Sequence, residues 1–208
     1  GRDLSILADP ERFSRAAVEE MKYRMRLKLG TNAVASQLRQ WPHEGEGTLF
    51  RREYFRDKYV EAHELPSSGR DDCRGWDLAA SDTATADATA CVKMRMDSSG
   101  RIYVLDVREA RLTPGGVDDM IRDTARADGT SVIQSFPQDP GSAGKHLVNH
   151  IARQLLQGHR FRSSPEMKDK ARRGEPFASQ CEHGNVYLVR APWNEAYITG
   201  LVEFPHGL

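Results

Sequence analysis

The sequence predicts an α/β fold in which a mixed β-sheet carries helices on both of its faces. Two stretches of alternating apolar and polar residues, at 88–97 and 101–112, are separated by a short turn and indicate an antiparallel hairpin. After them, helical and strand-like patterns alternate to the end of the chain, which favours parallel strands joined through helices. The chain has 208 residues, which is enough to bury a core without disulfides or a structural metal.

Composition and charge exclude several classes of protein. Hydrophobic residues make up 38% of the chain and charged residues 29%, as in globular proteins rather than membrane or disordered ones. The 30 basic residues balance the 30 acidic ones, so nucleic-acid binding would depend on a local patch. No apolar run approaches a membrane span of about 18 residues, and the N-terminus lacks a secretory pattern. Three cysteines without a C-x-x-C pair fit a reducing compartment.

The first 72 residues differ from the rest of the chain. An Asp-Pro pair at 9–10 is typical of a helix start, apolar residues follow at helical spacing, and Gly30 ends that pattern. A second, shorter helix is expected at 31–38, before the breaker-rich run at 41–47. We therefore interpret this region as a linker or helical appendage that leads to a domain beginning near Cys73.

The next three elements are expected to be strands. Residues 73–80 form a short apolar run that ends in small residues, which is typical of a buried strand. The segments 88–97 and 101–112 alternate between apolar and polar positions, and Asp97-Ser-Ser-Gly100 provides the turn between them. These residues predict three sequential strands, of which the last two form a hairpin.

From Thr113 onward, helices are expected to alternate with strands. Thr113 and Pro114 are typical of a helix start, Val117 and Ile121 share one face, and Gly129 ends the helix. The later elements are expected, in order, as a strand at 131–137, a helix within 141–158, a short strand at 159–162, a helix at 175–183, a strand at 186–190 and a helix at 193–204. Three antiparallel strands followed by strand–helix units are the layout of the RNase H-like fold.

Two aspartates fall where such a sheet gathers ligands. Asp77 lies inside the first strand, where a charge is costly unless it is paired or binds a cation. Asp139 lies just past the fourth strand, in a turn shaped by Pro140 and Gly141. With the first strand central and the fourth beside it, both carboxylates are expected at one edge of the sheet. Mg²⁺ or Mn²⁺ would relieve their repulsion. The alternative is a strand-end aspartate and an ordinary Asp-Pro-Gly turn.

Several segments resemble the nuclease domain of the large terminase subunit of tailed bacteriophages. The more specific ones are Pro137-Gln-Asp-Pro-Gly-Ser-Ala-Gly-Lys145 and the closing Phe204-Pro-His-Gly207. Weaker ones are Trp76-Asp77-Leu78-Ala79, Asp87-Ala-Thr89, Tyr103-Val-Leu-Asp106, Asp169-Lys170-x-Arg172, Gly184-Asn-Val186 and Trp193-Asn194. The resemblance runs from about Trp41 to the last residue. It implies an RNase H-like nuclease domain at 46–208. Because no Walker motif is present, residues 1–45 are expected to be a linker or helical appendage after a missing ATPase domain.

The resemblance also implies an activity and a site. The family cuts concatemeric double-stranded viral DNA with a metal-dependent endonuclease, so we expect two-metal phosphodiester hydrolysis. Asp77 and Asp139 would hold two Mg²⁺ or Mn²⁺ ions as metal ligands and catalytic residues. The family's third acidic motif would lie beyond Leu208, so the chain as given is expected to bind metal weakly and cut poorly.

Basic residues near these acids are candidates for DNA contact. Lys145 falls at a helix start beside Asp139, where backbone amides suit a phosphate, although the Walker A spacing is absent. Lys170 and Arg172 belong to a basic cluster that either contacts DNA phosphates or is a solvated face. The resemblance implies double-stranded DNA, the ATPase domain of the full-length chain, the small terminase subunit and the portal as partners. It also implies no membrane association and a location in the cytoplasm of the bacterial host.

Two other functions remain open at this point. One is another RNase H-like nuclease of the resolvase or integrase type, which would need a different spacing of acids. The other is a non-catalytic DNA-binding or docking module whose aspartates are structural. Metal-dependent cutting of DNA would distinguish both nuclease hypotheses from the binding module.

Overall fold

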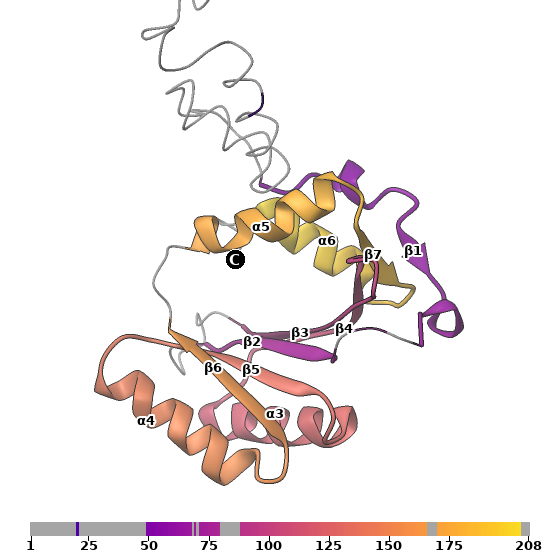
Figure 1. Cartoon of the computed structure of the whole chain (residues 1–208). Coiled ribbons are helices and arrows are strands. Elements are labelled where there is room, and N and C mark those ends of the chain that lie inside the picture. The colour runs from indigo at the N-terminus through magenta and orange to yellow at the C-terminus, as the bar shows by residue number, and fades with distance from the viewer. Residues whose placement is uncertain are drawn as a thin grey trace, which may run out of the picture.

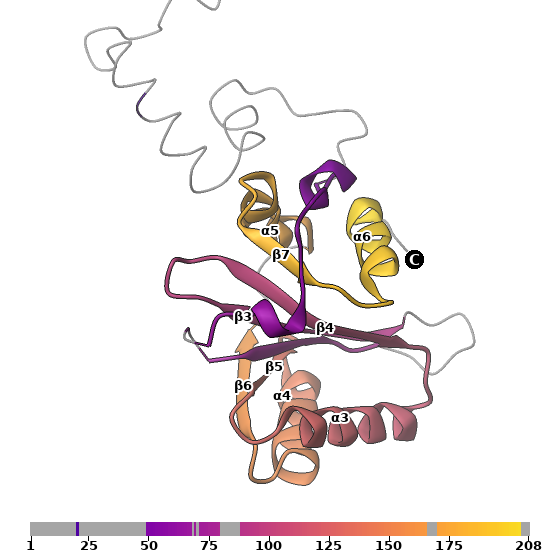
Figure 2. The ribbon, with the colours of Figure 1, turned by 90° about the vertical axis from the view of Figure 1, so that its right-hand side faces the viewer.

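The fold consists of one mixed sheet between two layers of helices. The computed structural model describes residues 49–67, 69, 71–79, 88–165 and 170–204, together with Glu20. Within these ranges, a seven-stranded sheet has α3 and α4 on one face and α5 and α6 on the other (Figure 1). Figure 2 shows the same layers after a quarter turn. The predicted mixed α/β sheet with helices on both faces is therefore confirmed.

The order of strands and helices along the chain agrees closely with the predicted order. The strands are β1 (Tyr59–Val60), β2 (Cys73–Asp77), β3 (Thr89–Met96), β4 (Ile102–Ala110), β5 (Ile133–Gln138), β6 (Arg160–Pro165) and β7 (Val186–Val189). The α-helices are α3 (Pro114–Asp128), α4 (Ser142–His150), α5 (Lys170–Glu182) and α6 (Asn194–Glu203). Two 3₁₀ turns, η1 (Arg52–Phe55) and η2 (Ala62–Glu64), flank β1, and a π-helical turn, η3 (Ile151–Leu155), continues α4.

The sheet topology places β2 at the centre. The spatial order is β1-β7-β4-β3-β2-β5-β6, and β2, β3 and β4 form an antiparallel meander. On its other side β2 pairs in parallel with β5, with Cys73 opposite Ile133 and Gly75 opposite Ser135. The first predicted strand is thus central and the fourth lies beside it, as the sequence indicated. Because β2 and β5 are parallel, their carboxyl ends lie at the same edge of the sheet.

Local sequence signals explain most element boundaries. The Thr113 hydroxyl accepts a hydrogen bond from the backbone N–H of Gly116 and caps α3, and Gly129 ends that helix with a φ of 80°. In the β3–β4 turn, one Asp97 carboxylate oxygen accepts hydrogen bonds from the backbone N–H groups of Ser99 and Arg101. Side chain and backbone therefore agree on the turn that the pattern predicted.

Two hydrophobic cores lie on opposite faces of the sheet, and each covers a different half of the strands. One core includes Trp76, Ile121 and Phe136 and lies between β2, β3 and β5 and the α3–α4 layer. The other includes Val104 and Leu188 and lies between β4 and β7 and the α5–α6 layer. Because the second core lies over β4 and β7, it does not cover the α5-facing side of β2. Residues alternate between buried and exposed along β2, and the exposed ones lie on this side.

The segment before Cys73 is not a linker throughout, which corrects one expectation. Phe50 and Phe55 are buried in the core under α5 and α6, and β1 pairs in parallel with β7. The sequence pattern missed this part because a 3₁₀ turn and a two-residue strand are too short to show periodicity. The helices expected at 10–29 and 31–38 lie outside the described residues, apart from the helical Glu20.

Several further boundaries differ from the prediction. Strand β2 ends at Asp77 and not at residue 80, so Asp77 lies at the end of its strand rather than inside it. Helix α5 begins at Lys170, five residues before the predicted start at Glu175, although Pro176 then lies inside the helix. A Cβ on Gly174 would lie 2.8 Å from the Phe204 ring and 2.9 Å from Leu49, so tertiary packing holds this early part of the helix in place. Strand β6 continues to Pro165 beyond the predicted end at Arg162, because it pairs with β5 over six residues.

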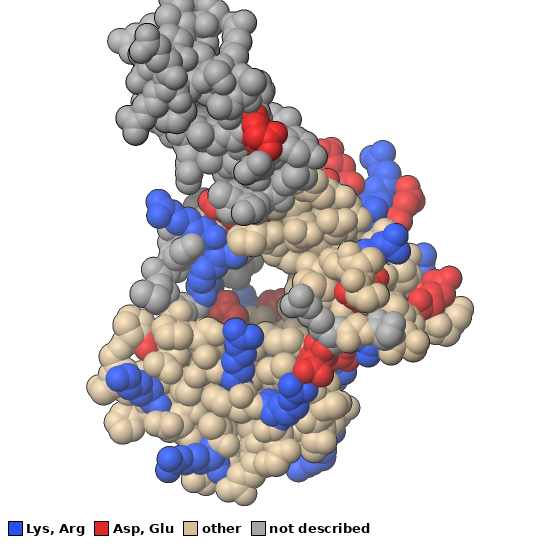
Figure 3. All heavy atoms as spheres, in the orientation of Figure 1, with Lys and Arg blue, Asp and Glu red and all other residues tan. Residues whose placement is uncertain are grey.

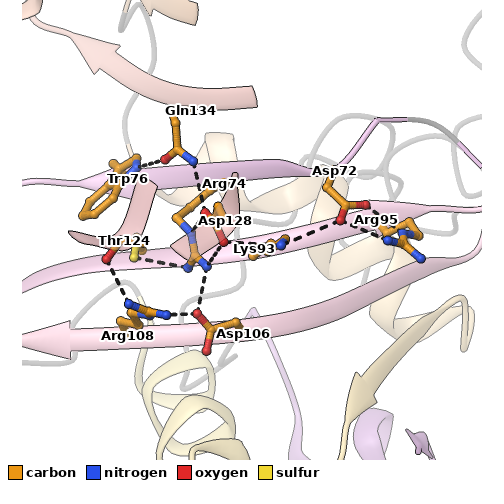
Figure 4. A network of polar contacts seen from close by, with 11 residues as sticks. Asp72, Arg74, Trp76, Lys93, Arg95, Asp106, Arg108, Thr124, Asp128 and Gln134 are labelled. Carbon is orange, nitrogen blue, oxygen red and sulfur yellow. Dashed lines mark hydrogen bonds and ion pairs between the residues drawn. The ribbon is translucent and has the colours of Figure 1, made fainter. Parts of the chain in front are cut away.

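A network of charged groups crosses the α3-facing side of the sheet (Figure 4). Arg74, fully buried on β2, donates through Nη2 to Asp128 Oδ1 and to Asp106 Oδ2, both at 2.8 Å. The Gln134 amide donates to Asp128 and accepts from Trp76 Nε1 at 2.9 Å, which links β5 to β2. Side-chain hydrogen bonds thus tie three strands to the C-terminal end of α3.

The network makes stability depend on pH through Asp128. Burial alone would raise the pKa of Asp128, but hydrogen bonds from Arg74 and Gln134 outweigh it and lower the pKa to about 2 from an ordinary 3.8. A lowered carboxyl pKa stabilises the fold above the unfolded value, and this stability disappears as the pH falls from about 4 towards 2. The free energy of unfolding should therefore fall by roughly 2 kcal/mol over that range from this group alone.

Urea unfolding at a series of pH values would measure this contribution. The Asp128→Asn variant removes the titrating group, so its unfolding free energy should decline less steeply between about pH 4 and 2 than that of the wild type. Equal slopes for the two proteins would contradict the role assigned to Asp128.

Candidate functional site

The two candidate acids lie at the carboxyl ends of neighbouring parallel strands. Asp77 is the last residue of β2, and Asp139 directly follows Gln138, the last residue of β5. Both residues are exposed, and the Asp77 side chain retains 63% of its accessible surface. Along β2, Arg74 and Trp76 are buried against the α3–α4 layer, so Asp77 and Gly75 face the α5 side. The charge predicted inside a buried strand is thus on that strand's exposed face.

A cavity of about 410 Å³ adjoins Asp77 on this face of the sheet. Its lining includes Gly75, Ser135 and Ser164 from three adjacent strands and Lys170 and Arg173 from α5. Figure 3 shows the molecule hollowed between α5 and the sheet, with acidic and basic side chains at the edge of the hollow. Asp139 does not belong to the lining of this cavity. Small strand residues and helix cations therefore enclose a space that begins at the Asp77 carboxylate.

The start of α5 supplies the positive charge beside this cavity. Lys170 is the first residue of the helix, and its Nζ lies 3.3 Å from Asp77 Oδ2. The first turn also carries Arg172 and Arg173 and contains no acidic residue. The macrodipole makes positive charge unfavourable at a helix N-terminus, by about 0.3–1 kcal/mol for each exposed group. A cluster of positive side chains at a helix N-terminus is typical of a surface that binds an anion.

Two glycines shape the chain around Asp139. Gly141 has a φ of 100° and a ψ of −176°, a conformation essentially restricted to glycine, and it precedes α4. A Cβ on Gly144 would lie 2.2 Å from the backbone oxygen of Asp139, closer than real Cβ atoms come. The backbone at Asp139 therefore packs directly against the first turn of α4, and the Pro-Gly-Ser-Ala-Gly run holds it there.

Replacing Gly144 by alanine should destabilise the protein by about 1–3 kcal/mol, since the backbone of Asp139 must move to admit the methyl group. Gly115 of α3 is the matched control, because a Cβ there meets nothing within 4 Å. Gly115→Ala should be neutral or stabilising by up to about 1 kcal/mol. Urea unfolding of both variants measures the contrast, and equal effects would contradict the close approach at Asp139.

The remaining predicted residues are distributed around this region. Lys145 is exposed in the first turn of α4, next to the Asp139 turn, and Arg172 is exposed on α5; neither lines the cavity. The nearby acids Asp82 and Asp87 lie outside the described residues, as does His206. Sequence reasoning missed the small-residue floor made by Gly75, Ser135 and Ser164. The only sequence signal for this floor is that small residues recur on the exposed side of β2, β5 and β6.

Two kinds of feature are absent from the described ranges. No cluster of three or more His, Cys, Asp or Glu side chains with the arrangement of a metal site occurs among the described residues. No helix among them is long and apolar enough to cross a membrane. The three cysteines are all unpaired thiols.

Sequence comparison relates the chain to one family. A profile of the family described as the terminase RNase H-like domain matches residues 74–207, which is more than half of the chain. No curated protein sequence matches the chain significantly.

Structural comparison gives three similar proteins. The large terminase of a thermophilic bacteriophage is 13% identical, with a TM-score of 0.54, over 93% of this chain and 46% of that one. The large terminase nuclease domain of bacteriophage SPP1, crystallised with bound Mn, is 13% identical over 69% of this chain and 75% of that one, with a TM-score of 0.45. The Holliday junction resolvase of fowlpox virus is 9% identical over 62% of this chain and 83% of that one, with a TM-score of 0.38.

The likeness to the large terminase of the thermophilic bacteriophage concerns the fold. Together with the family match, it establishes the RNase H-like α/β fold that the order of elements predicted. The chain spans less than half of the length of that large terminase.

Proposed function

Because the chain belongs to the family of terminase RNase H-like domains, we propose that it is the metal-dependent endonuclease domain of a phage DNA-packaging terminase large subunit. Its substrate would be concatemeric double-stranded viral DNA, and its reaction hydrolysis of phosphodiester bonds. The observation that carries this proposal is the pair Asp77 and Asp139 at the carboxyl ends of two adjacent parallel strands, with Asp77 in the lining of a cavity bordered by cations. In open α/β sheets, ligands gather at this edge.

The donor groups at this edge fit Mg²⁺ or Mn²⁺. Both ions prefer oxygen ligands, and each aspartate offers two carboxylate oxygens in an exposed position that water can reach. The Asp77 carboxylate already attracts a cation in the structure, namely the ammonium group of Lys170. Asp77 and Asp139 would hold two divalent ions, with further oxygen ligands from water or from residues outside the described ranges.

The residues around the site have separate roles in the proposed reaction. When bound, the ions would supply Lewis-acid polarisation of the scissile phosphate. Lys170 and Arg172 at the start of α5, and Lys145 at the start of α4, would bind phosphates of the DNA backbone. Gly75, Ser135 and Ser164 leave room above the sheet, and a Cβ on Gly75 would meet nothing within 4 Å. A DNA strand would thus approach the carboxylates closely. Because such contacts read phosphates rather than bases, cleavage would be sequence-tolerant.

The same family match supports a proposal for the wider setting of the domain. The large terminase of the thermophilic bacteriophage extends well beyond the part that matches this chain. We propose that an ATPase domain precedes the nuclease domain in the full-length chain, with residues 1–45 as the connecting segment. The small terminase subunit and the portal would be its packaging partners, in the cytoplasm of the bacterial host.

A plasmid-nicking assay tests the proposed activity directly. Supercoiled plasmid incubated with the protein should become nicked and linear when Mn²⁺ is present and should stay intact in EDTA. The Asp139→Asn protein, purified in the same way, should leave the plasmid intact and thereby exclude a contaminating nuclease. Undiminished cutting by that variant would refute the site. Tight DNA binding by the full-length chain without metal-dependent cutting would instead support the non-catalytic DNA-binding alternative.

A further inference from the structure

We propose that Lys170 occupies the cation position on Asp77, so that a divalent metal must displace its ammonium group in order to bind. The inference rests on the proposed function, because it takes Asp77 as a metal ligand. It adds a regulation of that site: the chain carries its own competitor for the metal.

The contact itself is the first support. Lys170 Nζ lies 3.3 Å from Asp77 Oδ2, and both residues line the same cavity. The two side chains come from different layers of the fold, since Asp77 ends β2 and Lys170 begins α5. The ammonium group therefore bridges the cavity at its acidic end, where a metal bound through Asp77 Oδ2 would lie.

The second support is the difference between the two acids. Among the described residues, the Asp139 carboxylate has no hydrogen-bond or ion-pair partner, whereas Asp77 has Lys170. Two carboxylates at one sheet edge repel each other, and a cation on either of them relieves part of that repulsion. In the absence of metal, Lys170 thus neutralises only one of the two candidate metal ligands, namely Asp77.

The pair is also weak enough to be exchanged. The Lys170 and Asp77 side chains are 55% and 63% exposed, and ion pairs exposed to this extent contribute little to stability. Lys170 is further disfavoured by its position at the positive end of the α5 macrodipole. A divalent ion carries twice its charge and can engage several oxygens at once. Metal binding would release Lys170 to the cavity wall, beside Arg173, where a phosphate would lie.

Titration with Mn²⁺ tests the competition without relying on cleavage. Free Mn²⁺ gives an electron paramagnetic resonance signal that decreases on binding, so the affinity of the 208-residue chain can be measured in the absence of DNA. Lys170→Met should bind Mn²⁺ about two- to fivefold more tightly than the wild type, since it removes a competitor worth a few tenths to 1 kcal/mol. Lys170→Gln should behave in the same way, and thermal unfolding should show both variants folded.

Two further variants make the outcomes distinguishable. Lys145→Met removes one exposed positive charge near Asp139 and should change the affinity by much less; an equal gain would reduce the effect to general charge repulsion and overturn the inference. Asp77→Asn should bind Mn²⁺ more weakly. If it does so while Lys170→Met matches the wild type, the competition is refuted and the proposed function stands. If Asp77→Asn binds as the wild type does, Asp77 is no ligand and both proposals fall.

Discussion

Replacing Arg74 by methionine is expected to lower the free energy of unfolding by about 3–5 kcal/mol, which is the typical cost of removing one partner of a buried ion pair. Arg74 has no exposed surface and contacts two carboxylates, Asp106 and Asp128. Burial opposes the charge of Arg74, but the hydrogen bonds with Asp128 raise its pKa above the ordinary value, so the side chain stays charged. Without the guanidinium group, the Asp128 side chain, only 4% exposed, would keep Lys93 as its nearest cation, at 3.3 Å.

A matched substitution separates the buried pair from the loss of charge in general. Arg126 of α3 forms an exposed ion pair with Asp123, so Arg126→Met should cost less than about 0.5 kcal/mol. Urea unfolding of the three proteins gives the comparison directly. A cost below about 1 kcal/mol for Arg74→Met would contradict the picture of Arg74 as the centre of the network.

A double-mutant cycle then identifies the source of the cost. The Arg74→Met/Asp128→Leu protein removes both charges, so neither partner is left buried without the other. It should be more stable than the sum of the two single effects predicts, because the penalty for stranding a charge is counted in each single variant. Additive effects would mean that lost packing, rather than a stranded charge, destabilises the single variants.

The fold was largely predictable because its elements carry local signals. Helix α3 has a capping threonine, a proline in its first turn and a closing glycine, and the β3–β4 hairpin has a turn whose side chain makes the required hydrogen bonds. The succession of strands and helices along the chain then indicated the order of the sheet. Strand β1 and the start of α5 escaped prediction because their structure depends on tertiary contacts: Phe50 and Phe55 in the core, and Gly174 against Phe204.

The positions of the two candidate acids in the fold were predictable from the sequence, but their surroundings were not. Asp77 stood out as a charge within a predicted strand and Asp139 as an acid just past another, and the topology brings the ends of those strands to one edge. The partner of Asp77 was not identifiable as such, because Lys170 belongs to a helix almost a hundred residues later and meets Asp77 only across the folded cavity. No periodicity within one segment encodes such a contact.

Replacing either Asp77 or Asp139 by asparagine should lower the rate of Mn²⁺-dependent plasmid cleavage by roughly 100-fold or more. Loss of a residue that merely supports a metal ligand already costs about 10- to 100-fold, so loss of a ligand should cost at least the upper end of that range. Asparagine preserves the size of the side chain and removes its charge. Because Asp77 is exposed, its replacement should change the free energy of unfolding by less than about 1 kcal/mol. Activity and stability should therefore separate.

The double variant gives the decisive comparison. If both aspartates hold the same metal centre, either single substitution already disables it, and the Asp77→Asn/Asp139→Asn protein should be no slower than the slower single variant. If the two residues acted independently, the losses would multiply. Asp119→Asn serves as the control, because Asp119 is an exposed aspartate of α3 paired with Arg122, and its cleavage rate should equal that of the wild type. Multiplying losses would refute the shared site, since residues that act as one unit do not contribute additively to a rate.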